Sequence, residues 1–264
     1  MASLHTNRGA KRAREAREAL GYTREGPLPD LLAAVEERGR AHAVLLDLPD
    51  GVAGAYIAKP DLPLLFVNGR QAPSRQRFTL AHEFGHHRMG HATVVDQQAD
   101  ISGYSHDPNE ICANAFAAEF LMPRDAVAAW GKRDVDGAVT LEHIVLFAYE
   151  YGVSAQAARY AFATAKVLTN TKRGKQLDGE IADELHVEVA QRLGLEPLEH
   201  ELADASRRLP RIPPALRGSA LGDLLVGNLD VEGLAQRLGR EPCKVQAMLD
   251  GLGIAQLLPS AATN

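Results

Sequence analysis

The sequence has few cysteines and no long apolar run, and both shortages exclude classes of protein. Two cysteines, Cys112 and Cys243, cannot form the disulfide framework that is typical of small secreted domains. No apolar run approaches the roughly 18 residues that a membrane-spanning helix needs. Residues 1–17 are basic and rich in alanine, without the apolar segment of a secretory signal. We therefore expect a soluble, cytoplasmic protein with no membrane partner.

Two common catalytic signatures are missing as well. The sequence contains neither a glycine-rich phosphate-binding loop nor a Gly-x-Ser-x-Gly nucleophile elbow, and it has no convincing internal repeat. What remains is a chain of 264 residues, 45% of them hydrophobic. That is enough to bury a sizeable core in one large domain or two small ones.

The most informative motif is His-Glu-Phe-Gly-His at residues 82–86. On an α-helix, positions i and i+4 lie one above the other, so His82 and His86 present two imidazoles to one point, which suits a metal ion. Glu83 leaves the helix about 100° round from His82, where it can reach a water beside the metal without being a ligand. The motif therefore predicts a zinc peptidase site with Glu83 as the catalytic base.

A catalytic zinc site needs a third protein ligand, and Glu110 is the predicted one. The segment 107–123 is predicted to form a helix because it begins with Asp-Pro, a capping pair, and ends at a proline. Asn114 lies one turn after Glu110 on the same face, where its amide could hydrogen-bond a ligating histidine. Glu119 is the rival ligand, but nine residues at about 100° each place it on the opposite face.

Two stretches together resemble the ImmA/IrrE family of bacterial metallopeptidases. They are Arg-Phe-Thr-Leu-Ala-His-Glu-Phe-Gly-His-His at 77–87 and the segment 110–123, which ends in Asn-x-Phe-Ala-Ala-Glu-x-Leu-Met-Pro. The resemblance spans about residues 7–165. The family pattern often has Glu-Ala-Asn where this chain has Cys-Ala-Asn at 112–114, which removes a second glutamate and leaves Glu110 as the matching ligand.

The resemblance implies a thermolysin-like, gluzincin-type zinc site that makes a limited cut in a partner transcriptional repressor of the helix-turn-helix (XRE) type. Such a role belongs to transcription regulation and the stress response. In the predicted mechanism, zinc held by His82, His86 and Glu110 polarises a water and the scissile carbonyl, and Glu83 moves the water proton to the leaving amine. Manganese or another divalent ion would suit the same ligands. A further donor for the transition state is sought among Tyr104, His106 and His91.

Another class of function uses the same residues. A regulatory protein could keep zinc for its structure and sequester a repressor without cutting it. The intact Glu83 argues against this alternative, because a structural site needs no base.

The predicted fold is α+β, with a zincin-like domain over residues 1–168. Three apolar runs at 43–46, 54–58 and 64–67, separated by turn residues, predict a small three-stranded antiparallel sheet. Pro63 cannot donate to a sheet ladder, so it favours an edge position for the third strand. An edge strand beside the zinc helix could pair with an extended substrate.

The rest of the chain is predicted to be helical. A helix-turn-helix-like pair is expected near 140–168, a polar linker at 169–176, and a helical domain at 177–264 that serves in docking or dimerisation, so a homodimer is one expected assembly. Residues 177–264 hold 8 Lys and Arg against 14 Asp and Glu, a net charge of −6. This charge argues against direct nucleic-acid binding. Helical apolar spacing within the domain covers 178–193, 199–209 and 231–249.

Overall fold

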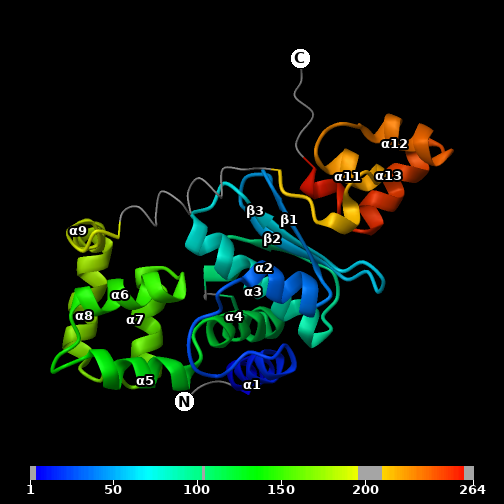
Figure 1. The fold of residues 1–264 in the computed structure, drawn as a ribbon. Helices are drawn as coiled ribbons and strands as arrows, with labels where there is room; N and C mark the ends of the chain where they lie inside the picture. Colours follow the sequence, from blue (N-terminus) through cyan, green and yellow to red (C-terminus); the bar gives the residue numbers. More distant parts are fainter. Residues whose placement is uncertain (1–3, 103–104, 196–209, 259–264) are drawn as a thin grey trace.

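The computed structural model describes residues 4–102, 105–195 and 210–258, and these residues form an α+β fold around one sheet (Figure 1). The predicted fold class is therefore confirmed. The predicted helix at 199–209 lies outside the described residues. None of the described helices is long and apolar enough to cross a membrane.

The sheet has four strands in the order β1-β3-β2-β4. β3 pairs in parallel with β1 and antiparallel with β2, and β4 pairs antiparallel with the other side of β2. The pairing of β2 with β4 contains an irregularity between Val52 and Gly54. The strands are β1 (His42–Leu46), β2 (Val52–Ile57), β3 (Leu64–Asn68) and β4 (Val94–Gln97).

This topology corrects the predicted three-stranded antiparallel sheet. The third apolar run, β3, lies inside the sheet and not at its edge, and β4 is a fourth strand that the apolar pattern did not indicate. Pro63 precedes β3, so its missing N–H costs the ladder nothing, and its carbonyl accepts a bond from the His42 amide at 2.9 Å. The edge next to the motif helix is consequently β4.

The two faces of the sheet belong to two separate apolar clusters. Alternate side chains of the same strand enter different clusters, because successive residues of a strand point to opposite faces. Ala43, Leu65 and Val67 pack with the motif helix, whereas Val44, Leu64 and Phe66 pack with the C-terminal helices. Burial on both faces explains why the runs are apolar throughout and show no alternation.

Three helices build the layer on the first face. Helix α3 (Pro73–Met89) carries the His-Glu-x-x-His motif and ends at Gly90, whose φ of 68° lies in the left-handed region. Helix α4 (Pro108–Leu121) begins as predicted, with the Asp107 side chain accepting a bond from the Asn109 amide at 2.7 Å. Helix α1 (Leu4–Ala19) packs along α4, and a short helical segment, α2 (Leu31–Ala33) with a π-turn over Ala34–Arg38, leads into β1.

A group of five helices follows α4, and the predicted helix-turn-helix-like pair lies in it as α6 and α7. The segment predicted to be a linker, 169–176, is helical from Thr171 onward, so this part of the domain prediction was wrong. Most of its polar residues face solvent, while the half-buried Arg173 donates to the Val139 carbonyl at 2.9 Å and Leu177 and Ile181 on the next turns are buried in the shared core. The helices are α5 (Arg124–Asp134), α6 (Leu141–Tyr151), α7 (Ala155–Thr164), α8 (Thr171–Ala182) and α9 (Leu185–Arg192).

The last described residues, 210–258, cover the second face of the sheet and lie on the opposite side of the molecule from α6–α9 (Figure 1). Arg211 connects this segment to the N-terminal part of the fold. Its backbone pairs with Leu45 of β1, and its guanidinium donates to Glu36 at 2.7 and 2.9 Å. The region predicted as one helical domain, 177–264, is therefore divided between two cores. Its helices on the sheet are α11 (Ala220–Leu225), α12 (Val231–Leu238) and α13 (Pro242–Gly251), flanked by 3-10 turns at Pro214–Leu216 and Ala255–Leu257.

Candidate metal centre

The two histidines of the motif face one point, as their spacing on α3 requires. His82 and His86 are 0% and 1% exposed, and their Nε2 atoms lie 3.1 Å apart. Such closeness between two imidazole nitrogens favours a shared cation, because two lone pairs at this distance otherwise repel each other.

The predicted third residue, Glu110, arrives from α4. Its Oε2 lies 3.1 Å from His82 Nε2, and its Oε1 lies 3.4 Å from His86 Nε2. Gly85 lets α4 come this close, since a Cβ at that position would stand 3.0 Å from the ring of Phe116. The structure thus brings together the three residues that were singled out as metal ligands.

A fourth residue, Asp96 of β4, completes the group and was missed by the sequence analysis. Its Oδ2 lies 3.5 Å from His82 Nε2 and 3.9 Å from His86 Nε2, and the side chain is buried. One ligand atom from each of the four residues lies within 4.8 Å of all the others. The available signal was a lone acid inside the short apolar run Val-Val-Asp at 94–96, a few residues after the motif.

The spacing of these atoms suits a divalent metal ion. Ligands about 2.0–2.1 Å from a tetrahedral zinc ion are separated from one another by roughly 3.3–3.4 Å. The two imidazole nitrogens and the two carboxylates give separations of 3.1 to 3.9 Å over the five pairs measured above. Two nitrogen and two oxygen donors suit zinc, and they also suit manganese.

The far nitrogen of each imidazole has its own partner. Asn114 donates its Nδ2 to the Asp100 carbonyl at 2.8 Å, so its Oδ1 is the acceptor that lies 3.0 Å from His82 Nδ1, as the helical spacing predicted. His86 Nδ1 lies 2.9 Å from His91 Nδ1. A proton on each far nitrogen leaves the Nε2 lone pairs directed at the metal position.

His91 accepts the bond from His86, which defines its role more narrowly than the sequence did. Burial, together with the nearby His86 and Arg8, lowers the pKa of His91 to about 4, so its ring is neutral and can accept. This contact makes His91 a positioning residue for His86. Of the other donor candidates, His106 is exposed and Tyr104 lies outside the described residues.

Glu83 has the environment of a general base. It is 0% exposed, and within the described part of the chain neither of its carboxylate oxygens has a hydrogen-bond partner. Burial raises the pKa of Glu83 well above its ordinary value, and the neighbouring Asp96 carboxylate adds to this effect. Space for the side chain exists because residue 54 on β2 is glycine: a Cβ there would stand 2.4 Å from Glu83 Oε1, below contact distance.

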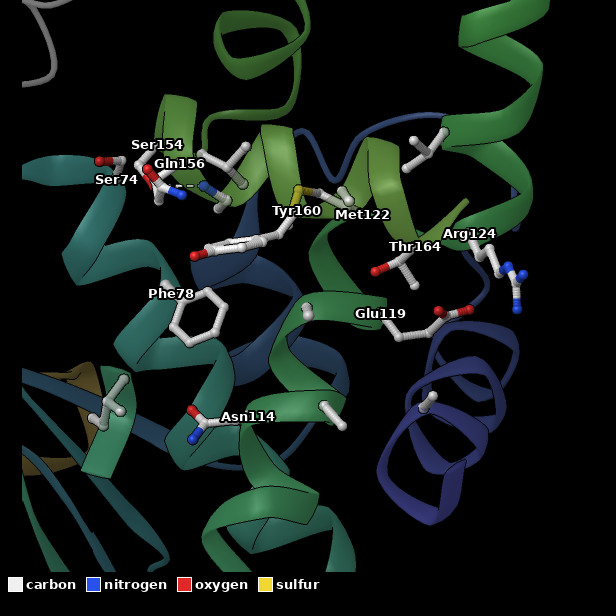
Figure 2. A pocket seen from close by; sticks show the side chains of 18 of the residues that line it. Ser74, Phe78, Asn114, Glu119, Met122, Arg124, Ser154, Gln156, Tyr160 and Thr164 are labelled. Atoms are coloured by element: carbon white, nitrogen blue, oxygen red, sulfur yellow. Dashed lines mark hydrogen bonds between the residues drawn. The ribbon is translucent and has the colours of Figure 1, made fainter. Parts of the chain in front are cut away.

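The rival ligand, Glu119, points away from this group, as the helical angle predicted. It forms an ion pair with Arg14 of α1 at 3.0 Å. It also lines a largely apolar cavity of about 450 Å³ between α3, α4 and α7. None of the four clustered residues lines this cavity, but Asn114 stands at one end of it (Figure 2), so one residue contacts both places.

Comparison with known proteins adds one finding. Residues 41–163, from the start of β1 to the last turn of α7, match the family model described as the IrrE N-terminal-like domain, Peptidase_M78. The matched segment contains Glu83 and all four clustered residues. No curated protein matches this sequence.

Proposed function

Residues 41–163 belong to the IrrE N-terminal-like peptidase family, and from this premise we propose that the chain is a zinc-dependent endopeptidase. Its proposed substrate is a partner repressor of the helix-turn-helix (XRE) type, cut at one site. The observation that carries the catalytic part is Glu83. Its carboxylate is fully buried and has no hydrogen-bond partner among the described residues, which costs folding free energy, and it lies beside a cluster of metal-ligand character. We infer that the buried carboxylate of Glu83 serves in catalysis.

The chemistry divides between the cation and the side chains. A divalent ion held by His82, His86 and Glu110 would supply Lewis-acid polarisation of the scissile carbonyl and of water. Glu83 takes the proton of the attacking water and delivers it to the leaving amine. Because Glu83 is buried, this transfer occurs away from bulk solvent, where electrostatic interactions are stronger.

Strand β4 is the proposed binding surface for an extended substrate. It forms the edge of the sheet beside the cluster, in the order β1-β3-β2-β4. An extended peptide that pairs with the outer side of β4 would gain main-chain hydrogen bonds and lie across the cluster. This edge takes the place of β3, which lies inside the sheet.

The test of the catalytic proposal compares wild type with Glu83→Gln. Zinc-loaded protein is mixed with the repressor encoded beside its gene, and fragments are identified by mass spectrometry. We expect one discrete cut in the wild type and a rate lower by about 10²–10⁴-fold in the variant, the usual contribution of a general base. Glu119→Gln, a matched change on the opposite face of α4, should cut normally. Equal cleavage by Glu83→Gln and wild type would refute the proposal.

The ligand assignment has its own measurement. Zinc affinity, determined by chelator competition, is compared in Glu110→Gln and Glu119→Gln. Loss of an outer partner typically costs 10–100-fold in metal affinity, so loss of a ligand at Glu110 should cost at least about that much. Glu119→Gln should bind zinc as the wild type does. An unchanged zinc affinity in Glu110→Gln would show that Glu110 is not a metal ligand.

A second function is favoured by one observation, the four buried residues at ligand spacing. Structural zinc sites are closed by four protein ligands. A protein of this kind would hold the repressor without cutting it. Binding that is equal in wild type and Glu83→Gln, with no fragment in either, would establish this alternative.

A further inference from the structure

Asp96 stands where a catalytic metal site normally has no protein ligand. Such sites use three protein ligands and leave one position for water. Three ligand atoms are already supplied by α3 and α4, and Asp96 Oδ2 approaches both imidazole nitrogens at 3.5 and 3.9 Å from the side of the sheet. It is therefore placed to fill the remaining position.

The burial of Asp96 requires an explanation. The residue is 1% exposed, and among the described residues its Oδ2 has no hydrogen-bond partner. A buried carboxylate oxygen without a hydrogen bond is unfavourable, whereas coordination to a cation satisfies both its charge and its lone pair.

Asp96 also lies next to the base. Its pairing partner on β2, Gly54, lies against Glu83, since a Cβ at residue 54 would stand 2.4 Å from Glu83 Oε1. The carboxylates of Asp96 and Glu110 both add to the raised pKa of Glu83. A side chain that borders both Glu83 and the two imidazoles occupies the region in which the attacking water has to stand, because the base must reach that water at hydrogen-bond distance. Water and Asp96 cannot occupy this region together.

We propose that Asp96 is a fourth protein ligand that holds the metal site in a closed, resting state. This inference rests on the proposed peptidase function. Before cleavage, the Asp96 side chain would move away from the two imidazoles, which would leave the position beside Glu83 open to water. The support is its location on β4, a four-residue edge strand whose pairing with β2 is irregular between Val52 and Gly54. A short edge strand can shift without rupture of the sheet, and pairing of a substrate with its outer side would act on Asp96 directly.

The first experiment measures metal binding and does not depend on cleavage. Zinc affinity is determined by chelator competition for wild type, Asp96→Asn and the control Asp183→Asn, which makes the same change at an exposed residue that caps α8. We expect zinc affinity to fall at least about tenfold in Asp96→Asn and to stay unchanged in the control. The cobalt-loaded wild type should show the intense visible absorption of a four-coordinate site, and the spectrum of Asp96→Asn should differ from it because water replaces a carboxylate oxygen among the ligands.

Equal zinc affinity and equal cobalt spectra in wild type and Asp96→Asn would overturn the inference. If Asp96→Asn does not fold, as judged by circular dichroism, Asp96→Ser is used in the same two measurements.

The second experiment measures cleavage of the repressor at saturating zinc. If Asp96 holds the site in a resting state, its replacement should open the site, so we expect Asp96→Asn to cut the repressor several-fold faster than wild type. Cleavage equal to or slower than wild type would overturn the resting-state role. If no variant and no wild-type protein cuts, while Asp96→Asn still binds zinc more weakly, Asp96 is a ligand of a closed structural site and the peptidase proposal fails. The two failures are thus distinguishable.

Discussion

Gly54→Ala tests whether the close approach of β2 to α3 positions Glu83. Residue 54 has no side chain, and a Cβ there would stand 2.4 Å from Glu83 Oε1, 2.7 Å from Thr79 Cγ2 and 2.8 Å from the Phe66 carbonyl oxygen. The carbonyl belongs to a paired strand, and Thr79 is buried on α3. Neither the Phe66 carbonyl nor Thr79 can move aside without a large cost in free energy. The motif helix and the sheet must therefore separate.

The expected magnitude follows from two opposing effects. Insertion of one extra carbon into a well-packed core typically costs about 1–3 kcal/mol. Replacement of glycine within a strand returns about 0.5–1 kcal/mol, because the unfolded chain loses freedom. With three contacts under 3.0 Å, overpacking wins, and we expect a net loss of about 2 kcal/mol in the free energy of unfolding. At roughly 2–4 °C per kcal/mol, Tm should fall by about 4–8 °C.

The assay compares Gly54→Ala with Gly179→Ala, a matched substitution in α8 where nothing lies within 4 Å of the added Cβ. The control should gain about 0.5–1 kcal/mol, as expected for Gly to Ala in a helix. Displacement of Glu83 should slow repressor cleavage by about 10–100-fold in Gly54→Ala. Its zinc affinity should fall as well, because separation of α3 from the sheet moves Asp96, the pairing partner of residue 54, away from His82 and His86. A Gly54→Ala protein with wild-type Tm and wild-type cleavage would refute the role given to Gly54.

Three further predictions concern contacts outside the cluster itself. Asn114→Ala removes the acceptor at His82 Nδ1 and should weaken zinc binding by about 10–100-fold, measured by chelator competition; Asn114→Asp, which keeps an acceptor, should recover most of it. Arg211→Ala removes the paired bonds to Glu36 and should lower the free energy of unfolding by about 1.5–3 kcal/mol in urea denaturation, and a smaller effect than that of exposed Arg192→Ala would contradict it. Burial outweighs the bond from Arg14 and raises the pKa of Glu119 above its ordinary value of 4.5, so the folded state binds its proton more tightly than the unfolded chain. The stabilisation from Glu119 is then full below about pH 4.5 and is lost as the pH rises through the raised pKa. In urea unfolding, the wild type should lose stability relative to Glu119→Gln as the pH rises through this range. A wild type that gains stability relative to Glu119→Gln over the same range would contradict the burial argument.

Local patterns predicted the parts of the site that lie on single helices. The spacing of His82 and His86, the choice of Glu110 over Glu119 and the position of Asn114 all follow from the angle between successive residues of a helix. The structure places each of these side chains as that angle requires. Their roles as metal ligands remain predictions, which the zinc measurements above will test.

The sheet could not be predicted in the same way. Its strands are buried on both faces, so their apolar runs carry no alternation that would reveal order or direction. The parallel pairing of β1 with β3 and the inclusion of β4 depend on what each strand meets in space. For the same reason, the segment 169–176 was interpreted as a linker: the apolar contacts that make α8 a helix lie later, at Leu177 and Ile181.

The sequence by itself determined which chemistry this chain carries, because two histidines and a glutamate at helical spacing make a motif that needs no tertiary information. Only the tertiary structure decided how many groups surround the metal position and how far they are open to solvent. Asp96 lies beside the histidines because β4 pairs with β2. The side chain of Glu83 on α3 has space because the residue that it contacts on β2, Gly54, has no side chain. Contacts between distant segments depend on packing, and packing is a property of the whole fold.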